Sequence, residues 1–413
     1  MAIINRLFEN IDSFFAWFSL SVKQTTDSYC DLETAEDQTT LVAHDGSLAS
    51  VIQIDGITHL LGTEEFQHLH DAIALSLQTN MKRPGHALQF FFSYDQEGIV
   101  NELNNILRPA EETAKRLELD LKDLFDERVR YLADYCGYEK AFVVLWTRPF
   151  ILTKEQASKA MKEKLNRIRE SQLPPMKYGQ NLAASIPEIR DQHRSLVRSI
   201  LQDFNGLNLT SKLLEVHEAV RAMRESVDPE FTDLEWRPVL PGDKIPPKEM
   251  QNIAGDISGL LLPSLGRQIL PRDAENLNLR TCRIGDRIYA TLFIDLFPQD
   301  IKPFTHLFNR VLQTNIPWRI SYLIESDGLS SFKLKPLIAN ILSFASPTNR
   351  LIGDAAEMLR YIAVNTDDAV VKLRVALSTW ASEKEYKSLR IRASELARAV
   401  EGWGTCEVSE VSG

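Results

Sequence analysis

Cysteine is scarce in this sequence and is never paired. The 413 residues include only four cysteines, none of them in a C-x-x-C motif: Cys30, Cys136, Cys282 and Cys406. A disulfide framework needs an ordered set of paired cysteines, which scattered single residues do not provide. The pattern therefore indicates a reducing compartment, and we expect a cytoplasmic protein.

Long apolar runs and an excess of positive charge are also missing. No run approaches the roughly 18 apolar residues that a membrane span needs. Arg6, Glu9 and Asp12 interrupt the apolar residues at the start of the chain, which argues against a signal peptide. The net charge of −10 argues against bulk capture of nucleic acid, although a local basic groove stays compatible with it.

The motifs of several enzyme classes are absent from the sequence. There is no G-x-x-x-x-G-K-[ST] loop for a nucleoside triphosphate, no G-x-G-x-x-G and no G-x-S-x-G. His217 and Glu218 begin HEAVR, which lacks the second histidine of a zinc-binding helix. From the residues alone we therefore expect no catalytic residue, no cofactor and no metal site in this chain.

What the sequence does contain is an alternation of strand and helix patterns. Its 44% hydrophobic residues are enough for sizeable cores, and its length predicts two or three domains. The first half predicts a hairpin at Asp45-Gly46, a helix over 64–80, a strand His86–Asp95, a helical stretch over 98–135 broken near Pro109, a strand Lys140–Thr147 and a helix opened by a T-x-x-Q capping box at Thr153 and Gln156.

A similar order returns in the second half. It predicts a hairpin at Gly285-Asp286, a helix over 299–314, a strand WRISYLIES, a broken helical region over 330–365, a strand over 369–380 and a helix opened by an S-x-x-E box at Ser382 and Glu385. The tetrapeptide LQTN ends the predicted helix of each half, at Leu77–Asn80 and Leu312–Asn315. We therefore expect Leu77 and Leu312 to be buried at equivalent helix ends.

These matches predict an α/β (α+β) fold made of two divergent copies of a hairpin-helix-strand-helix-strand-helix unit. The expected divisions are 1–40, an amphipathic helix with a polar lead-in; 41–171, the first unit; 172–278, a helical pair over 187–204 and 208–226 with a Pro/Gly-rich connector; and 279–413, the second unit. Two unrelated segments that share a common α/β pattern are the alternative explanation.

The first 22 residues predict an amphipathic helix that is unusually rich in aromatic side chains. Its apolar residues recur at helical spacing and include the candidate docking residues Phe8, Phe14, Phe15, Trp17 and Phe18. Such a stripe packs on its own protein or docks on a partner or a membrane surface. Because the stretch has few basic residues, a protein partner is favoured over anionic lipid.

Several segments together resemble a known family. ETAEDQTTLVAHDGSLASVIQIDG, FFAWF near the start, PSLGRQIL and the closing AVVKLRVALSTWAS and GWGTCEVSEVSG resemble the N-terminal region of the hexameric ATPases of type IV secretion and conjugation systems. The closest resemblance is to the IcmB/DotO (TraU-like) branch of the Dot/Icm-type systems, and it covers nearly the whole chain.

The resemblance implies a non-catalytic assembly and docking region whose motor domain, with its Walker motifs, ATP and Mg, lies beyond Gly413. It further implies a homo-oligomeric, hexameric parent at the cytoplasmic face of the inner membrane, peripherally associated there. Its partners would be other secretion-system components, including a second ATPase and inner-membrane proteins, and no nucleic acid is expected. The rival hypotheses are a nucleic-acid-binding module of a conjugation protein and a small-molecule enzyme with a cleft between the two units.

Overall fold

The computed structural model describes most of the chain from Cys30 onward. The described residues are 30–57, 59–82, 84–96, 98–170, 179–228, 231, 233, 235–244, 262–272, 274–298, 303–326, 357–366 without 360 and 363, 369–404 and 406–411. The predicted N-terminal helix and most of the helical region predicted over 330–365 therefore lie outside the described residues.

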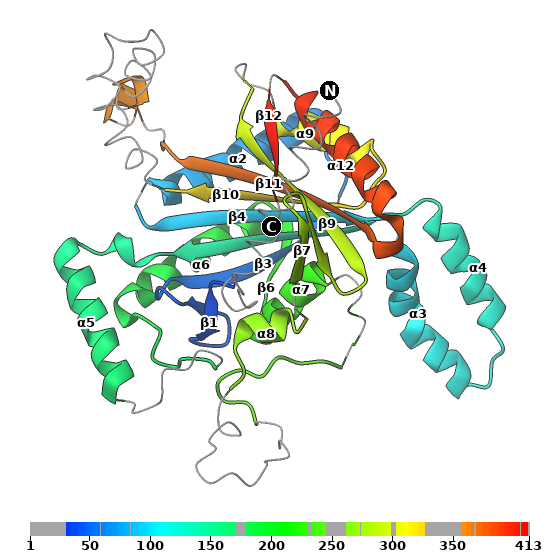
Figure 1. The fold of residues 1–413 in the computed structure, drawn as a ribbon, viewed down its shortest axis with the longest axis horizontal. Helices are drawn as coiled ribbons and strands as arrows, with labels where there is room; N and C mark the ends of the chain where they lie inside the picture. Colours follow the sequence, from blue (N-terminus) through cyan, green and yellow to red (C-terminus); the bar gives the residue numbers. More distant parts are fainter. Residues whose placement is uncertain are drawn as a thin grey trace, which may run out of the picture.

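A single sheet of twelve strands forms the centre of the fold (Figure 1). Its strands are β1 (Leu32–Ala35), β2 (Leu41–Ala43), β3 (Leu48–Ile57), β4 (His86–Asp95), β5 (Tyr138–Thr147), β6 (Leu209–Leu213), β7 (Ala274–Asn278), β8 (Thr281–Ile284), β9 (Arg287–Leu296), β10 (Trp318–Glu325), β11 (Lys372–Ser382) and β12 (Glu407–Val411). Mixed helix and strand content confirms the predicted fold class.

The order of strands is the same when it is read inward from either edge. One half is β1-β2-β3-β5-β4, the other is β7-β8-β9-β11-β10, and antiparallel pairing of β4 with β10 joins the halves. The strands off this path match as well, since β6 pairs with β3 and β12 pairs with β9. This is the strand order that two copies of one unit require, and common origin stays a prediction.

Four helices cover one face of the sheet, two for each half: α2 (Thr63–Met81), α6 (Arg190–Gly206), α9 (Phe304–Leu312) and α12 (Tyr386–Glu401). Ile200 and Phe204 of α6 pack on Ile52 and Leu88 in the first half, and Leu396 of α12 packs on the second half. Phe90 contacts both of these cores, so they lie on the same face of the sheet.

The opposite face of the first half is covered by α7 (Val216–Val227) and the short α8 (Leu265–Ile269). Val51 and Ile52 are neighbours in β3, and their side chains point to opposite faces because a strand alternates. Ile52 belongs to the core under α6, and Val51 packs with Val220 of α7 and Leu265 of α8.

Two helical elements extend from the sheet. The strands β4 and β5 are joined by α3 (Ile99–Arg116) and α4 (Lys122–Ala133), and α5 (Lys154–Glu170) follows β5. Figure 1 shows α3 and α4 side by side and projecting from the sheet, with α5 on the other side of the view. A small core that includes Leu103, Leu107 and Val129 holds α3 against α4.

The break predicted at Pro109 is wrong, because α3 continues through this proline to Arg116. Proline removes one helical hydrogen bond. Leu107, which precedes Pro109, and Ala114, which follows it, are nevertheless both buried. The helical stretch is interrupted later, over 117–121, before α4 begins.

Other local predictions also needed correction. Residues 209–213, predicted as helix, form β6, which adds to the sheet beside β3. The connector predicted over 172–278 thus contributes β6, and β7 as well, to the sheet. Ser382 ends β11 and its side chain caps no helix, so the second capping box is wrong. Leu77 is half-buried and lies inside α2, which continues to Met81, whereas Leu312 is the last residue of α9 and is 38% exposed. The prediction that both are buried at equivalent helix ends is therefore wrong.

Candidate functional site

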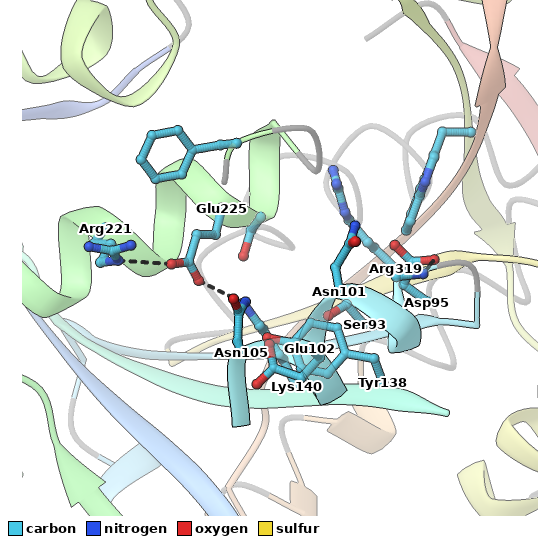
Figure 2. A pocket seen from close by; sticks show the side chains of 14 residues that line it. Ser93, Asp95, Asn101, Glu102, Asn105, Tyr138, Lys140, Arg221, Glu225 and Arg319 are labelled. Carbon is cyan, nitrogen blue, oxygen red and sulfur yellow. Dashed lines mark hydrogen bonds and ion pairs between the residues drawn. The ribbon is translucent and has the colours of Figure 1, made fainter. Parts of the chain in front are cut away.

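A polar cavity of about 160 Å³ lies where the two halves of the sheet meet. Its walls come from β4, β5, β10 and β11 and from α3 and α7 (Figure 2). They include Ser93, Asp95, Asn101, Glu102, Asn105, Tyr138, Lys140, Arg221, Glu225, Ser226, Arg319 and Trp380. We call it the inter-half cavity.

The end of β4 and the first turns of α3 place four side chains on this cavity. Asp95 ends β4, and its Oδ1 accepts a hydrogen bond of 3.0 Å from the backbone N–H of Gly98, just before α3. This bond fixes the direction in which α3 starts, in the way that side-chain caps do. Asn101, Glu102 and Asn105 follow in the first turns of α3 and line the cavity.

Lys140, Glu225 and Arg221 form an ion-paired group in the cavity wall. Lys140 Nζ donates to Glu225 Oε2 at 2.7 Å, and Arg221 Nε donates to Glu225 Oε1 at 2.9 Å. Burial favours the neutral amine of Lys140, but the Glu225 carboxylate outweighs it and raises the pKa of Lys140. Burial likewise favours the protonated acid at Glu225, yet Lys140 and Arg221 lower the pKa of this carboxyl.

These shifts argue against acid–base catalysis by the group. A general acid or base works best when its pKa lies near the operating pH, whereas both shifts hold Lys140 and Glu225 in their charged forms. Tyr138, whose ring lies 5.0 Å from Lys140 Nζ, also stays protonated, because burial raises the pKa of its phenol despite the nearby amine.

Arg319 enters the cavity from β10 and rests on aromatic rings. Its guanidinium carbon lies 4.4 Å from the Trp380 ring and 5.7 Å from the Tyr289 ring. Burial lowers the pKa of Arg319, and the Tyr289 side chain is a hydrogen-bond partner that opposes this effect. The Asp95 carboxylate, which lines the same cavity, also favours the charged guanidinium.

A second polar cluster is buried under α6, away from the cavity. Ser50 Oγ donates to the Thr39 carbonyl at 2.8 Å, so the contact of 2.9 Å with His193 Nε2 makes this nitrogen the donor. His193 Nδ1 is then the acceptor for Thr147 Oγ1 at 3.0 Å. Because His193 donates to Ser50, it cannot deprotonate this hydroxyl, and the pair does not form a nucleophile.

A third feature is an apolar cavity of about 450 Å³ between the sheet and α7 with α8. Phe91, Phe142 and Trp146 line it from the sheet, and Ala222 and Met223 line it from α7. The walls are mostly apolar, although Cys30, Asp31, Gln89 and Ser226 also line them. The inter-half cavity, in which charged side chains gather, is therefore the candidate site.

Within the described ranges, no group of three or more His, Cys, Asp or Glu side chains could hold a metal ion. No helix of the described part of the chain is long and apolar enough to cross a membrane. The sequence-based docking residues Phe8, Phe14, Phe15, Trp17 and Phe18 lie outside the described residues.

The residues of the inter-half cavity were not predicted. Lys140, Glu225 and Arg319 lie on three separate elements, and no short motif connects them. The one available signal was a charged residue, Lys140, at the start of an apolar strand. No protein-family model matches the chain, and no curated protein matches it either.

Proposed function

We propose that this chain is a non-catalytic assembly and docking region of a type IV secretion ATPase, of the Dot/Icm type. The family assignment rests on the resemblance of its sequence segments. In this proposal the parent protein is a hexameric ATPase whose motor domain binds ATP and Mg. The region anchors that motor at the cytoplasmic face of the inner-membrane complex, with a second ATPase among its partners.

The observation that carries the docking role is the apolar surface of the α3–α4 hairpin. Its exposed apolar side chains are Ile106, Leu117, Leu119, Leu121, Leu124, Tyr131 and Tyr135. The Tyr131 and Tyr135 rings also lie 5.1 Å apart, so they form one aromatic patch. Exposed apolar side chains in this number on a projecting element favour a protein contact site.

The electrostatics of the inter-half cavity support the absence of catalysis in this region. Its Lys140–Glu225 pair is held ionised on both sides, and its tyrosine is held protonated. Neither group offers the pKa near neutrality that proton transfer at neutral pH needs.

Membrane co-fractionation of the full-length parent protein tests this proposal. The hairpin variant Leu117→Ser with Leu124→Ser removes two side chains that are 60% and 57% exposed. We expect it to lose recruitment to the inner-membrane complex by at least tenfold and to keep its melting temperature. The matched control is Ile391→Ser on α12, which removes one side chain that is 59% exposed and should change neither readout.

A second pair of variants addresses the aromatic N-terminal stretch. Phe15→Ala with Phe18→Ala should also weaken recruitment, because a buried aromatic contact contributes a few kcal/mol at an interface, roughly 2 or more. Normal recruitment of both double variants would refute the docking role. A contact with lipid rather than protein predicts a different result. The unchanged protein would then still co-fractionate with membranes that lack the partner complex, and the Phe15→Ala, Phe18→Ala variant would not.

One observation favours the small-molecule alternative. The inter-half cavity takes Lys140 from the first half and Arg319 and Trp380 from the second, as a cleft between two units would. The ionised pairs disfavour catalysis there but leave ligand binding open. No comparable observation on the described residues favours the hypothesis of a nucleic-acid-binding module.

A further inference from the structure

We propose that the inter-half cavity is a binding site for a small carboxylate, held by the Arg319 guanidinium. The site does not depend on the docking function, and each can fail without the other. The cavity volume of about 160 Å³ is below the roughly 300–1,000 Å³ of pockets for drug-sized ligands, so the ligand is a small acid.

Arg319 has more hydrogen-bond donors than the Tyr289 side chain can occupy. A guanidinium has five N–H donors in a planar fork, and its burial is costly unless these donors are bonded. The Trp380 and Tyr289 rings contact the guanidinium but offer few acceptors for hydrogen bonds in the plane of its N–H groups. The Tyr289 hydroxyl supplies one hydrogen-bond partner. The nearby Asp95 carboxylate favours the charged guanidinium, while its Oδ1 accepts a hydrogen bond of 3.0 Å from the Gly98 N–H.

A carboxylate satisfies this fork better than a single-atom acceptor. Its two oxygens lie in one plane and accept two parallel hydrogen bonds from arginine. The Trp380 ring, 4.4 Å from the guanidinium carbon, packs against the side chain before a ligand arrives. This reduces the ordering cost of binding.

The charges on the walls of the cavity balance one another. Three cations, Lys140, Arg221 and Arg319, line the cavity together with three carboxylates, those of Asp95, Glu102 and Glu225. Glu225 is bonded to Lys140 and Arg221, so that group carries one net positive charge. Arg319, Asp95 and Glu102 together carry one net negative charge, so a carboxylate ligand depends on the Arg319 fork rather than on the total charge of the cavity.

The start of α3 adds polar and dipolar contributions. Ser93, Asn101 and Asn105 bring neutral hydrogen-bonding side chains to the same walls (Figure 2). The α3 N-terminus carries partial positive charge, which also favours an anion near Gly98 and Asn101.

Calorimetric titration of this chain with three probes tests the proposal. We expect succinate to bind, and we expect its neutral diamide to give no heat. Phosphate, which is tetrahedral, should bind more weakly than succinate. Binding of phosphate but not succinate would overturn the assignment of a carboxylate, and so would the absence of binding at millimolar succinate.

Substitutions then locate the site. Arg319→Gln should weaken succinate binding at least tenfold, and Arg319→Lys, which keeps the charge without the planar fork, should lie between it and the unchanged chain. Arg108→Gln is the matched control, because Arg108 is an exposed arginine of α3 outside the cavity walls. Unchanged affinity in a folded Arg319→Gln chain would overturn the proposal.

A second variant keeps the proposal testable if Arg319→Gln does not fold. Asn101→Leu changes an exposed helix position that lines the cavity, and it leaves Arg319 in place. We expect it to reduce succinate affinity by at least threefold, with normal helical circular dichroism. Full affinity in both Asn101→Leu and Arg319→Lys would refute the site. Recruitment to the membrane complex should stay normal in all of these variants.

Discussion

Buried His193 makes the stability of this chain depend on pH between about 4 and 6.5. The side chain is 1% exposed and is bonded to Ser50 and Thr147. Burial, and then the neighbouring His86, lower the pKa of His193 to about 4, while Asp37 acts weakly in the opposite direction. The imidazole is therefore neutral in the folded chain at neutral pH.

The size of the effect follows from proton linkage. Unfolding returns the pKa of His193 from about 4 to the ordinary 6.5. Each unit of pKa difference corresponds to about 1.4 kcal/mol, so the group contributes about 3 kcal/mol to the pH dependence. The unfolded chain takes up the proton first. Stability is therefore complete above pH 6.5 and is lost as pH falls towards 4.

Urea unfolding at a series of pH values measures this loss. Between pH 7 and pH 5, the free energy of unfolding should fall by about 2 kcal/mol on account of His193. The carboxyl groups with lowered pKa, including those of Asp37, Glu218 and Asp243, lose their contribution only at lower pH, because their ordinary values are 3.8 to 4.5.

Two glutamine variants assign the slope to one residue. His193→Gln can still form hydrogen bonds but does not titrate, so its stability should change little between pH 7 and pH 5. His68→Gln, at an exposed position of α2, should keep the full slope. The linkage argument is wrong if the unchanged chain shows no slope in this window, or if His193→Gln shows the same slope.

Two further predictions concern the apolar cavity and nucleotide binding. Ala222→Leu places extra carbon atoms in the 450 Å³ cavity and should raise the free energy of unfolding by about 0.5–2 kcal/mol in urea titrations. The matched Ala160→Leu, at a packed position that is 2% exposed, should lower it by about 1–3 kcal/mol, and equal effects would contradict the cavity. Calorimetric titration of the chain with Mg-ATP should give no binding heat, because the sequence has no phosphate-binding loop; micromolar affinity would contradict the assignment as a non-motor region.

Local signals in the sequence predicted the elements that depend on local contacts. The turns at Gly46 and Gly285 have positive φ, as a tight hairpin requires. The first capping box is confirmed, because the Thr153 N–H donates to Gln156 Oε1 at 3.0 Å and the Gln156 N–H donates to Thr153 Oγ1 at 3.3 Å. These bonds join residues that are three positions apart, so the local sequence is enough to predict this capping box.

Elements that depend on distant partners were missed. Residues Leu209–Leu213 continue the spacing of apolar residues that predicted a helix over 208–226. They nevertheless form β6, because they pair with Ile52–Ile57 of β3. The same limit applies to the inter-half cavity. Glu225 is 85 positions from Lys140, and only the packing of α7 on the sheet brings their side chains together.

The two proposed contacts both involve the helical connection between β4 and β5. The matching strands β1 to β6 and β7 to β12 form a nearly symmetric frame. The α3–α4 hairpin, inserted between β4 and β5, carries the exposed apolar patch, and its first turns form one wall of the inter-half cavity. Arg319 supplies the opposite wall from β10, the strand that pairs with β4 at the junction of the halves. Both proposals therefore depend on this connection and on the strand opposite it, and variants there should alter binding without disturbing the sheet.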